Sequence, residues 1–436
     1  KMDERKKLEK IVSLCKQRGF VFQSSEIYGG INGCYDFGPL GVEVLNNIKN
    51  YWWKTMTGQE NIVGLDASII MSPKVWEASG HVKSFSDPMV DCRSCKARFR
   101  IDDLDQQNIE QCPKCGKQEL TTPKNFNLMF QTHIGPSVDS SSVAYLRPET
   151  AQGIYVNFNN VVKSTRQKVP FGIAQIGKAF RNEINTKNFL FRVREFEQME
   201  MQYFIPPGTD EKWFEYWREQ RINWYKEIGI ADENLQVVET PAEDRAHYAK
   251  RAADIEYKFP FGFQEIEGIH NRTDYDLTKH QKFSGKKCEY FDPMTQKRYV
   301  PYILETSVGA TRLAFAVICD ALHEDEVKGE VRTILRFHPK IAPIKVAIFP
   351  LTKGEKEKAR KIYEELNKQF KCIYDVSGSI GKRYRRQDEI GTPYCVTVDG
   401  QSLEDGTVTV RDRDTMGQER IAGKALKQYL AEKLNL

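Results

Sequence analysis

The amino-acid sequence predicts an α+β protein, in which helices flank an antiparallel sheet and a small α/β domain follows. Strand-like runs bounded by turns recur between residues 171 and 307 with helical stretches beside them, whereas residues 344–411 alternate strand and helix. The length of 436 residues suffices for two or three domains with a large core. We therefore expect one domain over residues 1–340, with a helical insertion at 208–260, and a second over residues 341–436.

The first domain is expected to open with two helices. Residues 4–18 form the first, and a glycine-rich stretch precedes a longer helix that runs from Pro39 to about Thr57. An apolar stripe marks this second helix, and a strand predicted from Ile62 to Met71 follows it and ends at Pro73. This helix and strand are consistent with either an ordinary hydrophobic core or a dimer interface.

The remaining elements follow from local patterns. We expect helices at 209–228, 242–258 and 355–370 and at the C-terminal end, a linker-like turn at 323–343, and strands at 261–269, 298–307, 344–349, 372–375, 394–398 and 407–411. The succession of predicted helices and strands is interrupted at residues 88–122, which contain four of the ten cysteines.

These four cysteines have the spacing of a zinc ribbon. Cys92 and Cys95 form one C-x2-C pair, and Cys112 and Cys115 form a second after sixteen intervening residues. Four thiolates leave no open position for water, so the Zn²⁺ is expected to be structural. Two disulfides or unliganded thiols are the alternatives. The basic residues around the cysteines either contact RNA or are simply solvated.

Charge and hydropathy indicate a cytoplasmic protein without a membrane segment. No run of eighteen apolar residues occurs, and the first twenty residues lack the apolar core of a signal peptide. Residues 341–436 hold 18 Lys and Arg against 14 Asp and Glu, which accounts for most of the net charge of +5. The densest cluster there, Lys382-Arg383-Tyr384-Arg385-Arg386, suits a polyanion such as RNA, with a solvated face as the alternative.

The most informative segment is a predicted hairpin with the features of a nucleotide site. We expect strands from Phe171 to Ile184 and from Phe191 to Ile205, joined by a polar loop at 185–190. Strand side chains alternate between faces, so one face would present Arg181, Glu183, Arg192, Arg194, Phe196, Gln198, Glu200 and Gln202. Arginine suits phosphate, an aromatic ring stacks on a base, and a carboxylate accepts an ammonium or a sugar hydroxyl. An ordinary solvated face is the alternative.

A second phosphate clamp is predicted where a strand joins a helix at residues 305–312. Glu305 and Ser307 share a strand face, Gly309 frees the turn, and Arg312 stands in the first turn of a helix through about Leu322. An anion at that position would meet free backbone N–H groups, the helix dipole and an arginine together.

The chain resembles the class II aminoacyl-tRNA synthetases. The second helix with its strand and Pro73 looks like motif 1, the predicted hairpin looks like motif 2, and the segment 309–312 looks like motif 3. Within the class, residues 22–30, 76–81, 147–153 and 268–272 are similar to single-chain, homodimeric glycyl-tRNA synthetases, and the ribbon favours a bacterial type. The resemblance covers essentially the whole chain, including a C-terminal domain similar to the family's anticodon-binding domain.

The resemblance implies ATP, glycine and tRNA(Gly) as substrates, a homodimer, and Mg²⁺ held with ATP by Glu305 and Glu265. It implies that Arg181 holds the α-phosphate, Phe196 stacks on adenine, and Arg312 takes the far side of the base and the γ-phosphate, with Arg181, Glu305 and Arg312 catalytic. The implied ATP set is Arg181, Asn182, Glu183, Phe191, Arg192, Val193, Arg194, Glu195, Phe196, Glu265, Ile266, Gly309, Ala310, Thr311 and Arg312. The implied glycine set is Arg100, Glu149, Phe196, Glu197, Gln198, Met199, Glu200, Glu305, Thr306, Ser307, Val308 and Gly309.

The implied pocket favours the smallest amino acid. Glu149, Glu200 and Glu305 would meet the ammonium while Ser307 crowds the α-carbon, so a larger side chain would have to displace the carboxylates. The implied chemistry is adenylate formation and then transfer of the acyl group to a tRNA 3′-terminal hydroxyl, which rests on positioning and charge neutralisation. The alternatives are another class II synthetase with the same C-terminal domain, or an inactive homologue that binds nucleic acid. Intact Arg181, Arg192 and Arg312 argue against the inactive homologue.

Overall fold

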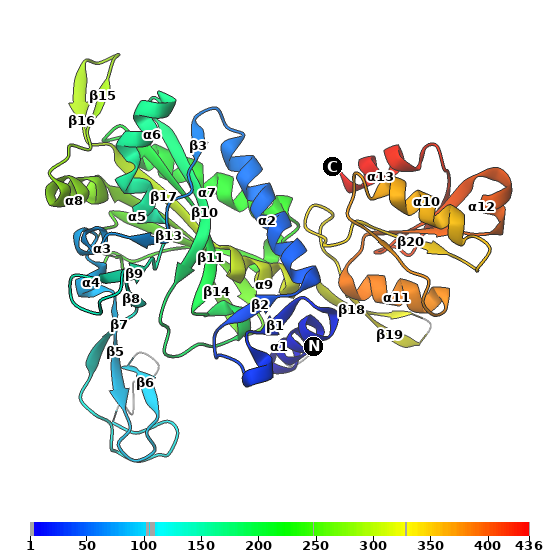
Figure 1. The fold of residues 1–436 in the computed structure, drawn as a ribbon, viewed down its shortest axis with the longest axis horizontal. Helices are drawn as coiled ribbons and strands as arrows, with labels where there is room; N and C mark the ends of the chain where they lie inside the picture. The colour runs from blue at the N-terminus through cyan, green and yellow to red at the C-terminus, as the bar shows by residue number, and fades with distance from the viewer. Residues whose placement is uncertain (1–3, 102–103, 105–109, 247, 328, 436) are drawn as a thin grey trace.

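The computed structural model describes residues 4–101, 104, 110–246, 248–327 and 329–435. Figure 1 shows a large body that holds the N-terminus and a smaller body that ends at the C-terminus. An arm that carries β5 (Ser86–Asp91) and β6 (Arg98–Arg100) hangs below the large body, and the short hairpin of β15 (Tyr290–Asp292) and β16 (Lys297–Tyr299) projects at its upper end (Figure 1). No helix among the described residues is long and apolar enough to cross a membrane.

A seven-stranded sheet forms the centre of the large body. Its order is β12 (Leu235–Glu239), β13 (Arg251–Phe259), β14 (Gly262–Thr273), β17 (Tyr302–Gly309), β11 (Glu195–Ile205), β10 (Phe171–Phe180) and β3 (Ile62–Gly64). All neighbours are antiparallel except β3, which runs parallel to β10. The prediction of an antiparallel sheet flanked by helices is therefore confirmed.

Helices cover the two faces of this sheet because alternate strand residues are apolar. On one face, Met199, Met201 and Tyr203 of β11 share a core with α2 (Pro39–Thr57), α7 (Asp210–Glu227) and α9 (Ala310–Ala321). On the other face, a smaller core gathers Phe204 of β11 with residues of α5 (Ala151–Val156), α6 (Phe158–Thr165) and α8 (Tyr275–Ser284). The polar residues of β11 alternate with the apolar ones, so they point toward the second face.

Shorter elements complete the large body. They are α1 (Glu4–Arg18), β1 (Val21–Gln23), β2 (Tyr35–Phe37), β4 (Ile70–Met71), α3 (Pro73–Ala78), α4 (His81–Ser84), β8 (Gln131–His133), β9 (Val143–Leu146), β18 (Leu322–Val327) and β19 (Glu330–Leu335), with single-turn 3-10 helices at Glu26–Tyr28, Phe189–Phe191 and Asp232–Asn234. The arm is a three-stranded sheet of β6 (Arg98–Arg100), β5 (Ser86–Asp91) and β7 (Lys124–Asn127). Part of the predicted ribbon, residues 102–103 and 105–109, lies outside the described residues.

Four predicted elements of the large body are wrong in kind or extent. The strand predicted over 62–71 is two short strands in different sheets, and the strand predicted over 298–307 is likewise divided between β16 and β17. The helix predicted over 242–258 is wrong, because residues 251–259 form β13, whose side chains alternate in burial as a sheet strand requires. The linker-like turn at 323–343 is also wrong. Its charged residues form the β18–β19 hairpin, in which Asp325 pairs with Arg332 across the strands.

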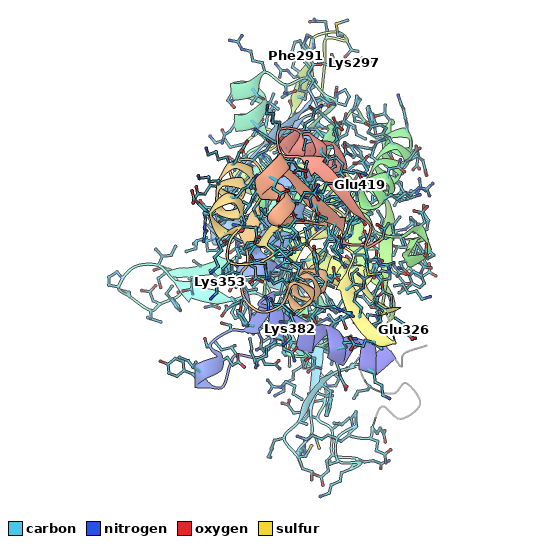
Figure 2. All side chains as sticks on the ribbon, turned by 90° about the vertical axis from the view of Figure 1, so that its right-hand side faces the viewer. Phe291, Lys297, Glu326, Lys353, Lys382 and Glu419 are labelled. Carbon is cyan, nitrogen blue, oxygen red and sulfur yellow. The ribbon has the colours of Figure 1, made fainter. Side chains whose placement is uncertain are left out.

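The smaller body is a five-stranded sheet with helices. Its order is β21 (Cys372–Tyr374), β20 (Val346–Pro350), β22 (Tyr394–Val398), β23 (Thr407–Asp412) and β24 (Gln418–Ala422), and its helices are α10 (Lys356–Leu366), α11 (Ile380–Ile390), α12 (Gly400–Asp405) and α13 (Leu426–Leu434). The sequence patterns did not predict helices α11 and α12 or strand β24. The basic cluster lies on α11, where Arg383 is buried and donates to the Pro350 carbonyl, whereas Lys382 lies on the outer surface (Figure 2).

Candidate active site

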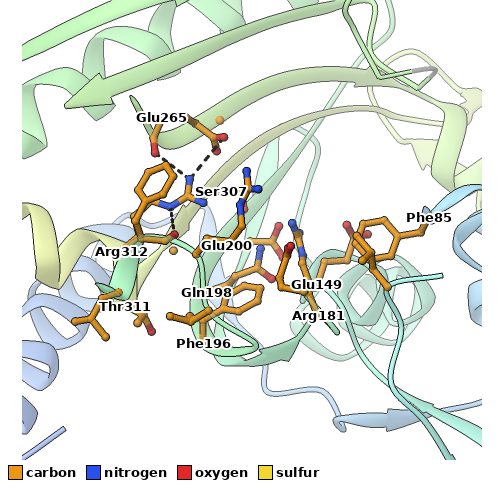
Figure 3. A pocket seen from close by; sticks show the side chains of 18 of the residues that line it. Phe85, Glu149, Arg181, Phe196, Gln198, Glu200, Glu265, Ser307, Thr311 and Arg312 are labelled. Carbon is orange, nitrogen blue, oxygen red and sulfur yellow. Dashed lines mark hydrogen bonds and ion pairs between the residues drawn. The ribbon is translucent and has the colours of Figure 1, made fainter. Parts of the chain in front are cut away.

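A pocket of about 430 Å³ opens beside the polar face of β11. Figure 3 shows its two ends, with Arg312 and Glu265 at one and Phe85 at the other, and Arg181, Glu149 and Glu200 between them. The lining residues are Phe85, Asp87, Arg100, Leu128, Glu149, Arg181, Glu183, Leu190, Phe191, Arg192, Val193, Phe196, Gln198, Glu200, Tyr248, Glu265, Gly268, His270, Glu305, Ser307, Gly309, Thr311 and Arg312. Most residues of the two expected substrate sets are therefore brought together.

Nine residues of those sets lie outside the lining. They are Asn182, Arg194, Glu195, Ile266 and Ala310 of the ATP set, and Glu197, Met199, Thr306 and Val308 of the glycine set. Several occupy strand positions that face the helical core, as Met199 and Val308 do. Two others have partners elsewhere, because Lys49 holds Glu197 at 3.0 Å and Arg194 donates to the Asn32 carbonyl at 2.6 Å.

The predicted hairpin is shorter than expected, and this corrects the strand argument for its arginines. The strands pair only as far as Phe180 with Glu195, so Arg181, Glu183 and Arg192 belong to the connection between β10 and β11. Arg181 reaches the pocket because its Nε donates to the Pro148 carbonyl at 3.1 Å. On β11 itself the alternation is as expected, since Phe196, Gln198 and Glu200 share one face and line the pocket.

Aromatic rings flank the Arg181 guanidinium. Its central carbon lies 5.4 Å from the centre of the Phe85 ring and 5.5 Å from that of Phe196. Flat rings hold a guanidinium without consuming its hydrogen-bond donors, which leaves the charge available to an anion.

Glu305 is the centre of a buried ion network. Its Oε2 accepts a hydrogen bond of 2.6 Å from Arg272, and its Oε1 lies 3.2 Å from His270 Nδ1. Arg272 also donates to Asp276 at 2.7 Å. Burial opposes ionisation, but Arg272 and His270 lower the pKa of Glu305 to about 2, so this carboxylate is charged at neutral pH.

The other two carboxyl groups of this cluster differ in charge. Burial opposes ionisation of Glu149, but His81, whose Nε2 lies 3.4 Å away, lowers its pKa. For Glu200 the balance is reversed, because burial and the charges of Glu305 and Glu149 raise its pKa to about 8. The cluster therefore holds two carboxylates and one neutral acid that a bound cation would ionise.

At the opposite end of the pocket, Arg312 stands at the start of α9. It donates to the carbonyls of Phe191 at 3.1 Å and Glu265 at 2.9 Å, and its guanidinium lies 4.4 Å from the centre of the Phe191 ring. The Glu265 carboxylate is 3.7 Å from the same guanidinium (Figure 3). This end combines a cation, an aromatic ring and a helix N-terminus, which suits a nucleotide.

Comparison with known proteins shows the family to which the chain belongs. Residues 137–322 match the family described as tRNA synthetase class II core domain (G, H, P, S and T), and residues 345–433 match the anticodon binding domain. The glycine--tRNA ligase of Treponema denticola is 60% identical over 430 residues, which are 96% of this chain and 95% of the relative. The chain belongs to the glycine--tRNA ligase family. Relatives with the same name from Borreliella burgdorferi, at 57% identity over 97% of each chain, and Clostridium acetobutylicum, at 52% over 99% of this chain and all of the relative, agree.

The site contains residues that the sequence argument missed. Gly268 and His270 line the pocket, and Arg272, on the same face of β14, belongs to the ion network of Glu305 without lining the pocket. The sequence marks the segment 268–272 only by its family resemblance, but its period-two pattern is a signal that places Gly268, His270 and Arg272 on one strand face. No sequence signal pointed to Phe85, Asp87 or Leu128, which come from the two ends of the arm.

The arm of this family member contains a four-cysteine cluster that could hold a metal ion. The sulfurs of Cys92, Cys95, Cys112 and Cys115 all lie within 4.8 Å of one another. The Sγ atoms of Cys92 and Cys115 are 3.7 Å apart, and those of Cys95 and Cys112 are 3.6 Å apart. These separations are too long for disulfide bonds, whose sulfurs lie about 2.05 Å apart, and short enough for a shared ion.

Proposed function

We propose that this chain attaches glycine to tRNA(Gly) at the expense of ATP, through a glycyl-adenylate intermediate. One observation supports this function above the others. Glu149, Glu200 and Glu305 converge in the same pocket as Arg181 and Arg312, with Glu200 and Glu305 buried and Glu149 half-buried, and the chain belongs to the glycine--tRNA ligase family. The carboxyl groups suit an amino acid's ammonium, and the arginines suit phosphates.

For ATP, we assign Arg181 to the α-phosphate, Phe196 to one face of adenine, and Arg312 to the other face and the γ-phosphate. The remaining ATP contacts are those of the implied set that line the pocket. The phosphates would carry Mg²⁺, with Glu265 and Glu305 as protein ligands, and the ion would neutralise charge on the phosphate oxygens. Charge neutralisation and alignment then suffice for the glycine carboxylate to attack the α-phosphorus and release pyrophosphate.

For glycine, we assign the ammonium to the three carboxyl groups and the α-carbon to Ser307. The pocket would select glycine by excluding larger amino acids, because any side chain larger than hydrogen would collide with a wall held in place by the Glu305 network. Exclusion of this kind discriminates better than attraction, since one extra methyl group in a roomy pocket gains only about 1–3 kcal/mol. The glycyl group would then pass to a 3′-terminal hydroxyl of tRNA(Gly).

We also propose how the rest of the chain serves this reaction. Residues 1–340 form the catalytic unit, with insertions at 88–122 and 208–260, and residues 341–436 bind the anticodon arm. Two copies form a homodimer, and the enzyme acts in the cytoplasm. The second half of the 208–260 insertion is not helical, because β12 and β13 follow α7 there.

The four cysteines fit a structural Zn²⁺ ion. A tetrahedron with Zn–S bonds of about 2.3 Å has sulfurs about 3.8 Å apart, close to the 3.6 and 3.7 Å between the two measured pairs. Four thiolates fill the coordination sphere, so the ion would supply rigidity and no chemistry.

Amino-acid-dependent exchange of pyrophosphate into ATP tests the function. We expect exchange with glycine and none above background with alanine, serine, proline, threonine or histidine, each assayed separately. Exchange stimulated by another amino acid, or the absence of glycine-dependent exchange in the folded protein, would overturn the assignment. Charging of tRNA(Gly) transcripts, with tRNA(Ala) as the control, then tests the second step.

A further inference from the structure

The four-cysteine arm reaches into the pocket at its root. Asp87 on β5 and Arg100 on β6 line the pocket, as do Phe85 just before β5 and Leu128 just after β7. One wall of the pocket therefore belongs to an insertion whose far end is the cysteine cluster.

The inner part of this wall is tied to the main body. Leu128 N–H donates to the Phe85 carbonyl at 3.0 Å, and Asn182 N–H donates to the Leu128 carbonyl at 2.7 Å. Strands β5 and β7 also pair over four residues. Phe85 and Leu128, together with the Arg181 guanidinium that Phe85 flanks, therefore have supports that do not involve the cysteines.

The outer part contains Arg100 and strand β6. Strand β6 is three residues long, and among the residues that the structure describes it pairs with residues 89–91 of β5. Arg100 Nη2 lies 3.1 Å from Asp87 Oδ1, which aims the guanidinium at the pocket. The turn between β5 and β6 runs from Cys92 to Ala97, and both Cys92 and Cys95 lie in it. Because so short a hairpin is marginally stable alone, closure of this turn by a metal would decide where β6 lies.

We propose that the metal held by the four cysteines positions Arg100 in the pocket wall, and so sets the affinity for glycine while leaving that for ATP nearly unchanged. The proposal rests on the proposed function and on the assignment of Arg100 to glycine. The route is physical and short: the ion closes the Cys92–Cys95 turn, the turn places β6, and the Asp87 carboxylate orients Arg100. Between β6 and the nucleotide end lies the inner part of the wall, Phe85 and Leu128, whose supports do not involve the cysteines. Loss of the metal should therefore leave the nucleotide end in place.

Three variants of the full-length protein test the role of the metal. Cys115→Ser removes a ligand, Cys115→His keeps a four-ligand site of the Cys3His type, and Cys372→Ala removes a cysteine outside the cluster. Bound zinc is measured by atomic absorption, and glycine and ATP binding are measured separately by calorimetry. We expect Cys115→Ser to lose zinc and bind glycine about tenfold more weakly, the loss of one charge-assisted hydrogen bond, with ATP affinity within about twofold. Cys115→His and Cys372→Ala should match the parent.

A fourth variant separates Arg100 from the metal. Asp87→Asn should retain zinc and the parent melting temperature but show the same selective loss of glycine affinity, and it stays informative even where Cys115→Ser fails to fold. Unchanged glycine affinity in zinc-free or Asp87→Asn protein would overturn the proposal, and so would an equal loss of glycine and ATP binding. Parent enzyme that lacks glycine-dependent exchange would instead refute the proposed function, so the two failures are distinct.

Discussion

The two ends of the pocket hold their charges in different ways. At the glycine end, Glu305, Arg272 and Asp276 are buried and satisfy one another before any substrate arrives. Arg312 at the nucleotide end and Arg181 in the middle of the pocket are partly exposed, and backbone carbonyls and aromatic rings hold them. A buried network rigidly defines a small space, whereas loosely held arginines keep their charge available for phosphates. The contrast predicts that mutations at the two ends will have separable effects.

The largest expected effect is on stability at the glycine end. Arg272→Met leaves Glu305 and Asp276 buried without their cation, and breaking such a network costs about 3–5 kcal/mol in the free energy of unfolding. Urea unfolding followed by circular dichroism measures it. Arg332→Met, which breaks the buried pair with Asp388 far from the pocket, is a matched control for folding. It should retain its affinity for glycine. An Arg272→Met protein as stable as the parent would show that the network does not define this end.

The second-largest expected effect is a loss of catalytic rate when an arginine assigned to ATP is removed. Arg181→Ala removes a charge that we assign to the α-phosphate in the transition state, and loss of such a group costs about 10²–10³ in kcat. Glycine affinity should stay near the parent value, and unfolding should change little because the side chain is partly exposed. Pyrophosphate exchange gives kcat, and calorimetry gives glycine affinity. Arg194→Ala, on a neighbouring residue outside the pocket lining, is the control.

A third effect concerns exclusion at the glycine end. Ser307→Val adds bulk beside the proposed α-carbon position and should lower glycine-dependent exchange by at least about tenfold, while ATP binding persists. The added volume faces the pocket and not the core, so stability should hold. Unchanged exchange by this variant would contradict the assignment of Ser307.

The smallest expected effect is a pH dependence. The Glu200 pKa is raised to about 8 in the folded protein, above an ordinary value of 4.5, so its contribution to stability is present below pH 4.5 and declines as pH rises toward 8. Glycine's ammonium would favour the ionised form, so binding near pH 7 should release a proton, and affinity should increase up to about pH 8. A change of one in the pKa of Glu200 on binding glycine would correspond to about 1.4 kcal/mol of binding free energy.

Calorimetry in buffers with different ionisation enthalpies measures this proton release. Glu200→Gln should bind glycine without releasing a proton, and Glu149, whose pKa is lowered, should contribute none in this range. Heats that do not depend on the buffer would contradict the assignment of the proton to Glu200.

Much of the site was predictable from the alternation of strand side chains and from sequence motifs. Where the sequence-based predictions are wrong, there is a physical reason. Phe196, Gln198 and Glu200 follow from strand alternation because β11 is a regular strand paired on both sides. The same argument fails for Arg181 and Arg192, because the strands separate after Phe180 and tertiary contacts aim those side chains. The misassigned helix at 242–258 fails for another reason. Its second half pairs with strands on both sides, and such pairing overrides local helical preference.

The sequence by itself determined the family, the antiparallel sheet, the four-cysteine cluster and most of the residues that meet in the pocket. These features depend on local spacing and alternation, which a linear sequence carries directly. Only the tertiary structure decided that Arg272 and His270 hold Glu305, that Glu200 differs in charge from its neighbours, and that the arm supplies a wall of the pocket. Each of these depends on burial and on distances between residues far apart in the chain, because charge and pKa respond to neighbours in space.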